Sequence, residues 1–386
     1  LRTREPPGRL TPSPDPEPDH LPEPPMTTFV QLHLLTAYPP ANLNRDDTGR
    51  PKTARFGNVD RLRVSSQALK RAWRTSPAFK AALEGHLGER TQRLGEEIEG
   101  HLLKQGVAEA AARKAAREVA DVFGKIKGEG DKYPTRIEQL VFVSAEERRD
   151  ALALAERIAG GESIDLTKTP LLRPVDGAVD IGMFGRMLAD DPDFNREAAV
   201  QVAHAVTTHR AVVEDDYYTA IDDLKTPAED AGAGFVGEAG FGAGTFYLYL
   251  CIDRDLLARN LGGDADLARR GLAALIHAAA TVGPKGKQAS FASRALASYG
   301  LVEVSDGAPH TLAAAFLKPV GGEDVLAGSV AAFEATRNGF RTAYDLPPSR
   351  RDEDPEGWRG NDGPWPVFNT LTGEGSLKRL IACATR

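Results

Sequence analysis

The stretch RLRVSSQALKRAWR, residues 61–74, begins with four residues that alternate between basic and apolar side chains. Leu62 and Val64 fall on one side of an expected strand, and Arg61 and Arg63 fall on the other, because strand side chains alternate with a period of two. This alternation is typical of a strand with one buried face. We therefore expect both arginines to point outward.

A basic helix is expected directly after this strand. Ser65 and Ser66 belong to the residue types favoured at a helix N-cap. One surface stripe of the helix holds the polar residues Gln67, Lys70, Arg71 and Arg74. The opposite side holds the apolar residues Leu69, Ala72 and Trp73, which we expect to face the core. Because a helix N-terminus also offers unpaired amide groups, the sequence predicts a patch that binds the phosphates of a nucleic acid backbone.

A solvated amphipathic helix is the alternative, and it is the more common explanation of a basic stripe. The local charge favours the binding interpretation. Residues 41–80 contain ten Lys or Arg and three Asp, a net charge of +7, whereas the whole chain has a net charge of −7. A region whose sign is opposite to that of the rest of the protein suits a polyanionic partner.

The composition is that of a soluble globular protein. The 386 residues are 41% hydrophobic and 27% charged, and the length allows two or three domains. No apolar run approaches the roughly 20 residues that span a bilayer, so no membrane partner is expected. Cys251 and Cys383 form no CxxC pair, which indicates neither a disulfide scaffold nor a zinc site and favours a cytoplasmic location. Residues 1–25 are rich in proline and predicted to be disordered, and we expect Met26 to be the physiological start.

The remaining patterns predict an α+β fold with a small sheet and a helical insertion. Ser144 and Glu147 form a capping box at the start of one expected helix. Strands are expected at residues 27–36, 140–143, 177–188, 245–252, 301–304 and 311–316. Helices are expected within residues 78–127, 144–158, 193–206, 264–282 and 324–336, and the tail from residue 347 is expected to be irregular.

An acidic, glycine-rich excursion precedes the strand at 245–252, and its length predicts a lid or a protruding arm. Tyr217 and Tyr218 lie on this arm, where they either stack on bases or pin the arm to its own domain. Apolar side chains of the glycine-rich segment before it, Met183, Phe184 and Met187, are further candidates for contact with bases.

Two glycine-containing motifs suggest nucleotide binding only weakly. Gly232, Gly234 and Gly237 spell GxGxxG, but they follow an acidic loop instead of a strand, so a Rossmann site is not expected. The loop GPKGKQ, residues 283–288, lacks the first glycine and the Ser/Thr of a P-loop. Its lysines, Lys285 and Lys287, either contact phosphates or are solvated.

Catalytic and metal-binding patterns are weak as well. His204 and His209 precede two acidic residues and allow a metal site, although a packing role is favoured. Asp46 and Asp47 allow an acid/base or metal pair, but they are explained more simply as ion-pair partners of Arg45. Since no Ser, Thr or Cys has a recognisable base nearby, the sequence favours a binding protein without metal or cofactor over an enzyme.

From Met26 onward, the sequence resembles the CasC-type backbone subunit of the type I-E CRISPR Cascade complex. The matching stretches are LNRDD (43–47), FG (56–57), RLRVSSQALKRAWR (61–74), GRM (185–187), AHAVTTHR (203–210), YYTAIDDL (217–224), NLGG (260–263) and GPKGKQ (283–288). They follow the family's order along nearly the whole chain, and the SSQALKRAWR block is specific.

The resemblance implies an α+β fold in which an RRM-like (ferredoxin-like) palm carries an inserted helical fingers domain and a protruding thumb hairpin. The implied divisions are a tail at 1–25, palm segments at 26–74, 177–211 and 245–386, fingers at 75–176 and a thumb at 212–244. The last palm segment includes the C-terminal tail.

The resemblance also implies a role without catalysis. Copies of the chain would stack head to tail along guide RNA (crRNA) and leave its spacer bases free to pair with target DNA in antiviral defence. Other implied partners are the Cascade subunits CasA, CasB, CasD and CasE. The implied RNA contacts are Arg45, Lys52, Arg63, Ser65, Gln67, Lys70, Arg71, Arg74 and Lys287. The implied kink in the RNA lies at Met187, Tyr217, Tyr218 and Thr219. The alternative is a metal-dependent endoribonuclease of a type III-like effector, which would use Asp46 and Asp47.

Overall fold

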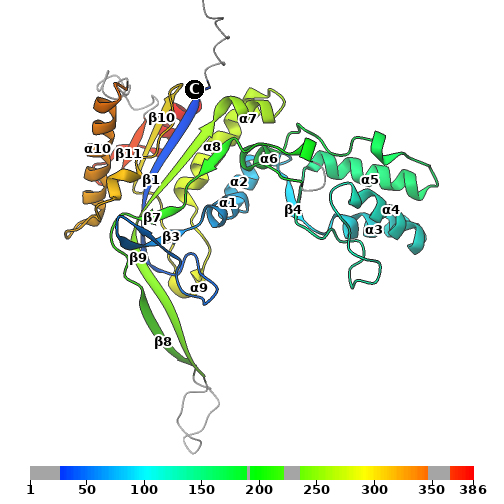
Figure 1. Ribbon diagram of the computed structural model, residues 1–386, viewed down its shortest axis with the longest axis horizontal. Helices are drawn as coiled ribbons and strands as arrows, with labels where there is room; N and C mark the ends of the chain where they lie inside the picture. Colours follow the sequence, from blue (N-terminus) through cyan, green and yellow to red (C-terminus); the bar gives the residue numbers. More distant parts are fainter. Residues whose placement is uncertain (1–26, 189–191, 221–234, 347–365) are drawn as a thin grey trace, which may run out of the picture.

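A large antiparallel sheet forms the centre of the molecule in the computed structural model, which describes residues 27–188, 192–220, 235–346 and 366–386 (Figure 1). The strand order is β12-β11-β10-β1-β9-β7-β3-β2, and β6 and β8 each pair with β9, so the expectation of a small sheet is wrong. The strands are β1 (Phe29–Ala41), β2 (Thr53–Phe56), β3 (Val59–Val64), β6 (Val200–Val202), β7 (Ala205–Thr207), β8 (Glu214–Ala220), β9 (Phe235–Asp253), β10 (Tyr299–Ser305), β11 (Val367–Asn369) and β12 (Glu374–Gly375).

The middle of the sheet is the pair β1 and β9, in which Leu32 lies opposite Leu250. Both strands carry nearly continuous apolar runs, as expected of strands that are covered on both faces. Leu34 packs into the core on one face, and its neighbour Leu35 packs into the core on the other. The prediction of a central first strand is confirmed.

Helices cover both faces of this sheet. One face is covered by α1 (Ser66–Arg74), α2 (Pro77–Ala82), α6 (Val179–Phe184), α7 (Arg254–Asn260), α8 (Ala265–Thr281) and α12 (Leu377–Ala384). The other face is covered by α10 (Val325–Ala343) and the 3-10 turn η3 (Ala313–Phe316). Among the described helices, none is long and apolar enough to cross a bilayer.

A largely buried charged cluster joins β1, β10 and α10. Glu303 Oε1 accepts a hydrogen bond from Arg337 Nε at 2.8 Å, and His33 Nε2 lies 3.5 Å from Glu303 Oε2. Burial opposes ionisation of Glu303, but the neighbouring His33 and Arg337 outweigh it and lower its pKa to about 2. The carboxylate is therefore ionised throughout the neutral pH range.

A separate helical unit extends to one side of the sheet (Figure 1). It contains α3 (Leu94–Lys104), α4 (Glu109–Asp121), α5 (Ala145–Ala159), the ribbon β4 (Glu89–Thr91) and β5 (Val141–Val143), and the turn η1 (Leu166–Lys168). Its apolar side chains form a core of their own. The predicted capping box at the start of α5 is confirmed, because Ser144 and Glu147 each accept the other's backbone N–H.

Buried ion pairs fix the chain where it leaves this helical unit. Arg186 Nη1 donates to both carboxylate oxygens of Glu147, at 2.8 and 2.7 Å. Arg196 Nη1 donates to Asp176 Oδ1 at 2.9 Å, and the backbones of the two arginines pair with each other. Removal of either partner would leave a buried charge uncompensated, so these pairs strongly restrict this junction.

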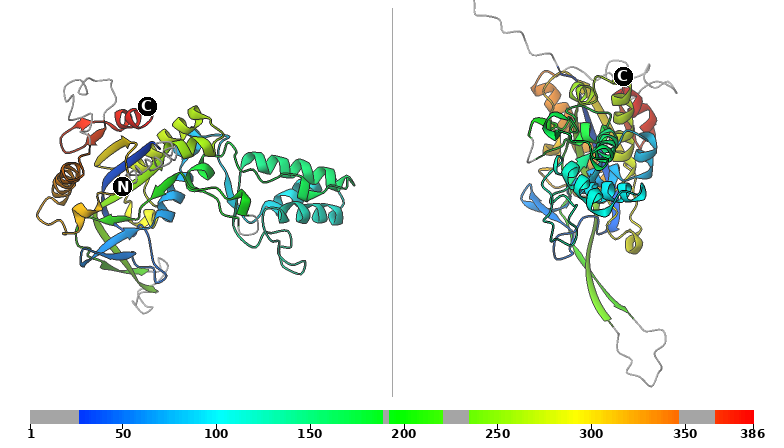
Figure 2. Two further views of the ribbon diagram at one scale, coloured as in Figure 1. Left: turned by 45° about the horizontal axis from the view of Figure 1, so that its top comes forward. Right: turned by 90° about the vertical axis from the view of Figure 1, so that its right-hand side faces the viewer.

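A long hairpin extends beyond the strand ends of the sheet (Figures 1 and 2). It consists of β8 and the first part of β9, with Asp216 opposite Ala239. At its base, β9 passes close to neighbouring segments. A Cβ atom at Gly242 would lie 2.8 Å from Leu62 Cδ1, and one at Gly244 would lie 2.5 Å from His209 Nε2. Glycine therefore lets β9 pass through a narrow gap.

Two expected elements have the wrong type. Residues 177–188 contain the helix α6 where a strand was expected. A short apolar run bounded by glycines does not distinguish a strand from a helix that is buried all round. Residues 193–206 form the 3-10 turn η2 (Pro192–Phe194) followed by β6 and β7, where a helix was expected. Valines at 200, 202 and 206 favour a strand in this segment.

Other expectations need smaller corrections. The strand expected at 311–316 is the turn η3, whose three alanines favour helical backbone. The tail was expected to be irregular, but its described part, residues 366–386, contains β11, β12 and α12. The helical region expected at 78–127 divides into α2, α3 and α4, with β4 between α2 and α3. The disordered tail expected at 1–25 lies outside the described residues.

Candidate nucleic-acid interface

The strand β3 leads through Ser65 into α1, as the sequence predicts. Ser65 is the N-cap, and its Oγ accepts the amide of Ala68 at 3.3 Å. Its own amide donates to Asn44 Oδ1 at 2.9 Å, which ties the start of the helix to the loop before β2. The predicted core-facing residues of α1, Leu69, Ala72 and Trp73, are all buried.

The expectation that Arg61 points outward is wrong. Its side chain is fully buried, and its guanidinium donates to three carbonyl oxygens, those of Phe56, Thr207 and Phe316. Because these carbonyls come from three separate segments, Arg61 links β3 to the rest of the fold. The alternation correctly placed Arg61 on the opposite face of the strand from Leu62. It did not show that other segments of the chain cover this second face as well.

Lys52 and Arg63 form a cationic cluster on the sheet edge beside α1, and His204 lies next to them. The amide of Arg63 donates to the carbonyl of Lys52 at 2.8 Å, so the two residues are neighbours. Arg63 Nη1 lies 2.8 Å from His204 Nδ1. Partial burial, followed by the charges of Arg63 and Lys52, lowers the pKa of His204. Positive charge from two chain segments therefore meets here, next to an imidazole that burial and these charges keep neutral.

The polar stripe of α1 is less uniform than its spacing suggests. Gln67 and Arg71 are exposed, and Lys70 is half-buried with Nζ 5.4 Å from the centre of the Phe184 ring. Burial lowers the pKa of Lys70. Arg74 differs from the others, because its guanidinium pairs with Asp180 and lies 4.2 Å from the centre of the Phe142 ring. A phosphate contact by Arg74 stays a prediction, in competition with this intramolecular partner.

The loop before β2 is fastened to the base of the hairpin. Asn42 Nδ2 donates to the carbonyls of Gly49 and Gly240, at 2.9 and 2.8 Å. Arg50 Nη1 pairs with Asp215 of β8 at 2.8 Å. Arg45 is exposed on this loop. The loop and the hairpin are thus parts of one surface.

The basic GPKGKQ loop reaches the same surface. Trp73 Nε1 donates to the carbonyl of Val282 at 3.2 Å, which fixes the start of this loop against α1. Gly286 packs so closely on the backbone of the loop before β2 that an added Cβ would lie 2.5 Å from Asn42 O. Lys287 follows with a left-handed backbone (φ 47°) as the N-cap of α9 (Gln288–Phe291). Its charge therefore adds to that surface.

Aromatic side chains stand out on the hairpin. Tyr217 and Tyr218 of β8 are 72% and 44% exposed, and Thr219 is also exposed. Met187 is 83% exposed, although it follows α6 and lies on another part of the chain from the hairpin. The tyrosines are exposed because β8 pairs with the first part of β9 in a hairpin that extends away from the sheet. Of the GxGxxG motif, only Gly237 lies within the described residues.

The structure gives little support to the alternative of a metal-dependent endoribonuclease. Asp46 Oδ1 accepts hydrogen bonds from the amides of Thr48 and Arg50 and from the Thr48 hydroxyl, as in an ordinary turn. These bonds, that from the Thr48 side chain foremost, lower the pKa of Asp46. Across the described ranges, no group of three or more possible metal ligands comes together. His204 contacts Arg63, and His209 Nε2 accepts the Thr245 amide at 3.3 Å.

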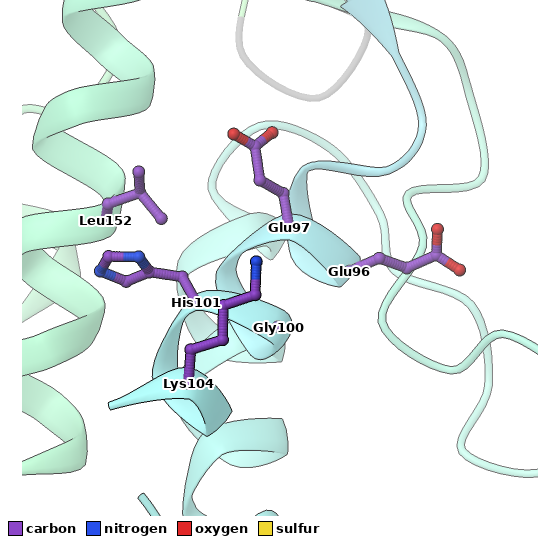
Figure 3. Close-up of a pocket in the computed structure, with 6 residues that line it drawn as sticks. All are labelled: Glu96, Glu97, Gly100, His101, Lys104 and Leu152. Atoms are coloured by element: carbon purple, nitrogen blue, oxygen red, sulfur yellow. The ribbon is translucent and has the colours of Figure 1, made fainter. Parts of the chain in front are cut away.

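One hollow lies elsewhere, on the helical unit, with a volume of about 400 Å³ (Figure 3). Its walls are Glu96, Glu97, Gly100, His101, Lys104 and Leu152. These walls carry both acidic and basic side chains, and His101 Nε2 lies 2.6 Å from Glu156 Oε1. This mixed charge suits a polyanion less well than the surface beside α1.

A family model described as CT1975-like protein matches residues 30–353. The chain belongs to this family of Cas proteins. Among solved structures, the CT1975-like chain is similar to a chain of a "CRISPR RNA-guided surveillance complex, pre-nicking", at 31% identity and a TM-score of 0.76, with 82% of this chain and 89% of that chain covered. A chain of another "CRISPR RNA-guided surveillance complex" is 28% identical with a TM-score of 0.63, and 82% and 88% of the two chains are covered. No match was found among curated proteins. The predicted resemblance to CRISPR backbone subunits is confirmed.

Proposed function

We propose that this CT1975-like protein is a scaffold subunit of a type I-E Cascade complex that binds the sugar-phosphate chain of guide RNA. Its RNA-binding surface is formed by the cationic cluster, the stripe of α1 and the two loops beside it. The proposed phosphate contacts are Arg45, Lys52, Arg63, Ser65, Gln67, Lys70, Arg71 and Lys287. Arg74 is left out because it already pairs with a buried carboxylate.

The observation that carries this proposal is the meeting of basic side chains from four segments at the start of α1. Hydrogen bonds from Asn42 and Trp73 fasten the contributing loops, so the surface is preformed. Phosphate contacts of this kind carry no sequence information. Guide sequence would instead be read by base pairing with target DNA.

The hairpin would serve as the thumb, with Tyr217, Tyr218 and Thr219 displacing a base of the guide at regular intervals. Met187 would act at the same kink from a neighbouring copy or from its own. Copies would assemble head to tail, and the other Cascade subunits would complete the ends. A head-to-tail interface produces an open filament, whose length the RNA would limit.

The first test is whether the purified chain carries short RNA of defined length. The second is the salt dependence of binding to single-stranded RNA. Lys70→Ala should weaken binding about equally for all sequences and reduce the salt slope by about one. Lys114→Ala is the matched control, because Lys114 is 75% exposed on α4 of the helical unit. An equal loss of slope in both variants would contradict the proposal.

A scaffold role also predicts that paired RNA survives incubation with magnesium. Asp47→Ala tests the endoribonuclease alternative more cleanly than Asp46→Ala, because Asp46 holds its own turn together. Metal-dependent cuts that disappear in Asp47→Ala would favour the enzyme.

A further inference from the structure

The contact between Arg63 and His204 defines the protonation state of the imidazole. Arg63 Nη1 lies 2.8 Å from His204 Nδ1. A guanidinium is always protonated and only donates hydrogen bonds, so Nδ1 must accept this one. His204 is therefore neutral in this arrangement, with its proton on Nε2.

The backbone on both sides of His204 is held by neighbouring strands. The amide of Ala203 donates to Tyr249 O of β9 at 2.9 Å, and Ala205 is paired with Val64 of β3. The side chain nevertheless remains exposed. The imidazole is thus held at the surface next to Arg63 and does not depend on a mobile loop.

The charges that act on His204 come from two neighbouring elements. Within the described part of the chain they are Arg63 of β3 and Lys52 of the loop before β2, and both are cations. Together with partial burial they lower the pKa of His204, because a third positive charge is disfavoured there. An anion placed among the three groups would reverse this effect.

We infer that His204 is a further phosphate contact of the proposed RNA-binding surface and that it takes up a proton from solvent when a phosphodiester binds. This inference rests on the proposed function. A phosphate oxygen would accept the N–H of Arg63 that Nδ1 now accepts, and Nδ1 would be left able to bind the proton. The resulting imidazolium donates through both nitrogens, and no other bond is made or broken.

Proton uptake on binding means that RNA affinity rises as the pH falls. The ordinary pKa of histidine is about 6.5, and it is lower in the unbound protein and raised beside a phosphate, so the response lies between those two values. We expect binding to tighten about five- to tenfold from about pH 8 to about pH 6 at constant salt, within the limit for a single proton.

The test uses the full chain and a fluorescent oligouridylate of about 30 nucleotides, with affinity measured by anisotropy at both pH values. His204→Asn is the informative variant, because its Oδ1 can still accept from Arg63 but its amide cannot gain a proton. His101→Asn is the matched control, since the side chain of His101 is partly exposed but lies on α3 of the helical unit. Calorimetry in two buffers with different ionisation enthalpies counts the protons taken up directly.

We expect His204→Asn to lose most of the pH response and the proton uptake, with its melting temperature little changed, while His101→Asn behaves like the wild type. Wild-type pH dependence in His204→Asn would overturn the inference and leave the proposed function standing. Equal weakening at both pH values would also overturn it, by showing that His204 only positions Arg63. If the wild type bound oligouridylate at neither pH, the proposed function itself would fail.

Discussion

Arg74, the last residue of α1, forms an ion pair with Asp180 of α6, and its Nε and Nη2 each lie 2.8 Å from the same carboxylate oxygen. The other carboxylate oxygen accepts the amide of Gly88 at 2.7 Å. Asp180 is almost fully buried, and burial raises its pKa despite the opposing charge of Arg74. The pair therefore joins the proposed RNA-binding surface to the start of the helical unit.

Arg74→Ala is expected to act on stability more than on RNA binding. Removal of one partner of a buried ion pair lowers the free energy of unfolding by about 3 kcal/mol. Urea unfolding measures this loss, and Arg74→Ala with Asp180→Asn should recover part of it. The salt slope of RNA binding should stay near that of the wild type. A slope reduced as in Lys70→Ala would show instead that Arg74 contacts phosphate.

The largely buried carboxylate of Glu303 predicts a loss of stability in acid. Its pKa is about 2 in the folded protein, against an ordinary value of 4.5. The carboxylate therefore stabilises the fold fully above pH 4.5, and this contribution, about 3 kcal/mol, is lost as the pH falls toward 2. Urea unfolding at about pH 7 and about pH 3 should show that Glu303→Gln is destabilised at pH 7 and differs less from the wild type at pH 3. A constant difference would contradict the assignment.

Gly286→Ala should displace the basic loop without removing a charge. The new Cβ would meet two backbone oxygens, Asn42 O at 2.5 Å and Leu43 O at 2.6 Å, so one segment must shift, at a cost of about 1–3 kcal/mol. We expect the salt slope of RNA binding to fall by about one, as in Lys287→Ala. Gly130→Ala is the control, since nothing lies within 4 Å of its added Cβ. An unchanged slope would place Lys287 outside the RNA-binding surface.

Tyr217→Ala should alter the shape of bound RNA more than its affinity. Tyr217 is 72% exposed on β8, so its loss removes little folding free energy. RNA that carries 2-aminopurine at successive positions reports base unstacking by fluorescence, and the periodic signal of the assembled complex should weaken. Tyr344→Ala is the control, because Tyr344 is 68% exposed but lies beyond α10. Identical RNA signals in the two variants would argue against a wedge at Tyr217.

Local signals in the sequence were sufficient to predict the strand, N-cap and helix around Ser65 and the capping box at Ser144. Each depends on residues a few positions apart, and each is confirmed. The family resemblance is also confirmed, because its motifs extend over nearly the whole chain.

What the sequence could not predict depends on long-range pairing. Arg61 was placed on the outer side, because nothing nearby shows that Thr207 and Phe316 would cover it. Likewise, the sequence indicates a packing role or a metal site for His204 but not a contact with Arg63, since that contact follows from the pairing of β3 with β7. The ion pair of Arg74 with Asp180 also depends on long-range packing. Asp180 lies in α6, within the segment 177–188 that was expected to be a strand.

The single strand β9 runs from Phe235 on the hairpin to Asp253 in the centre of the sheet. Its inner part is held by pairing with β1, while its outer part extends into the hairpin, so the hairpin behaves as a cantilever anchored in the sheet. A sideways load on the outer end produces torque at the narrow passage past Gly242 and Gly244, where there is little clearance for the strand to pivot. The arm's direction is thus set when the sheet folds, and every copy of the protein would hold its arm at the same angle.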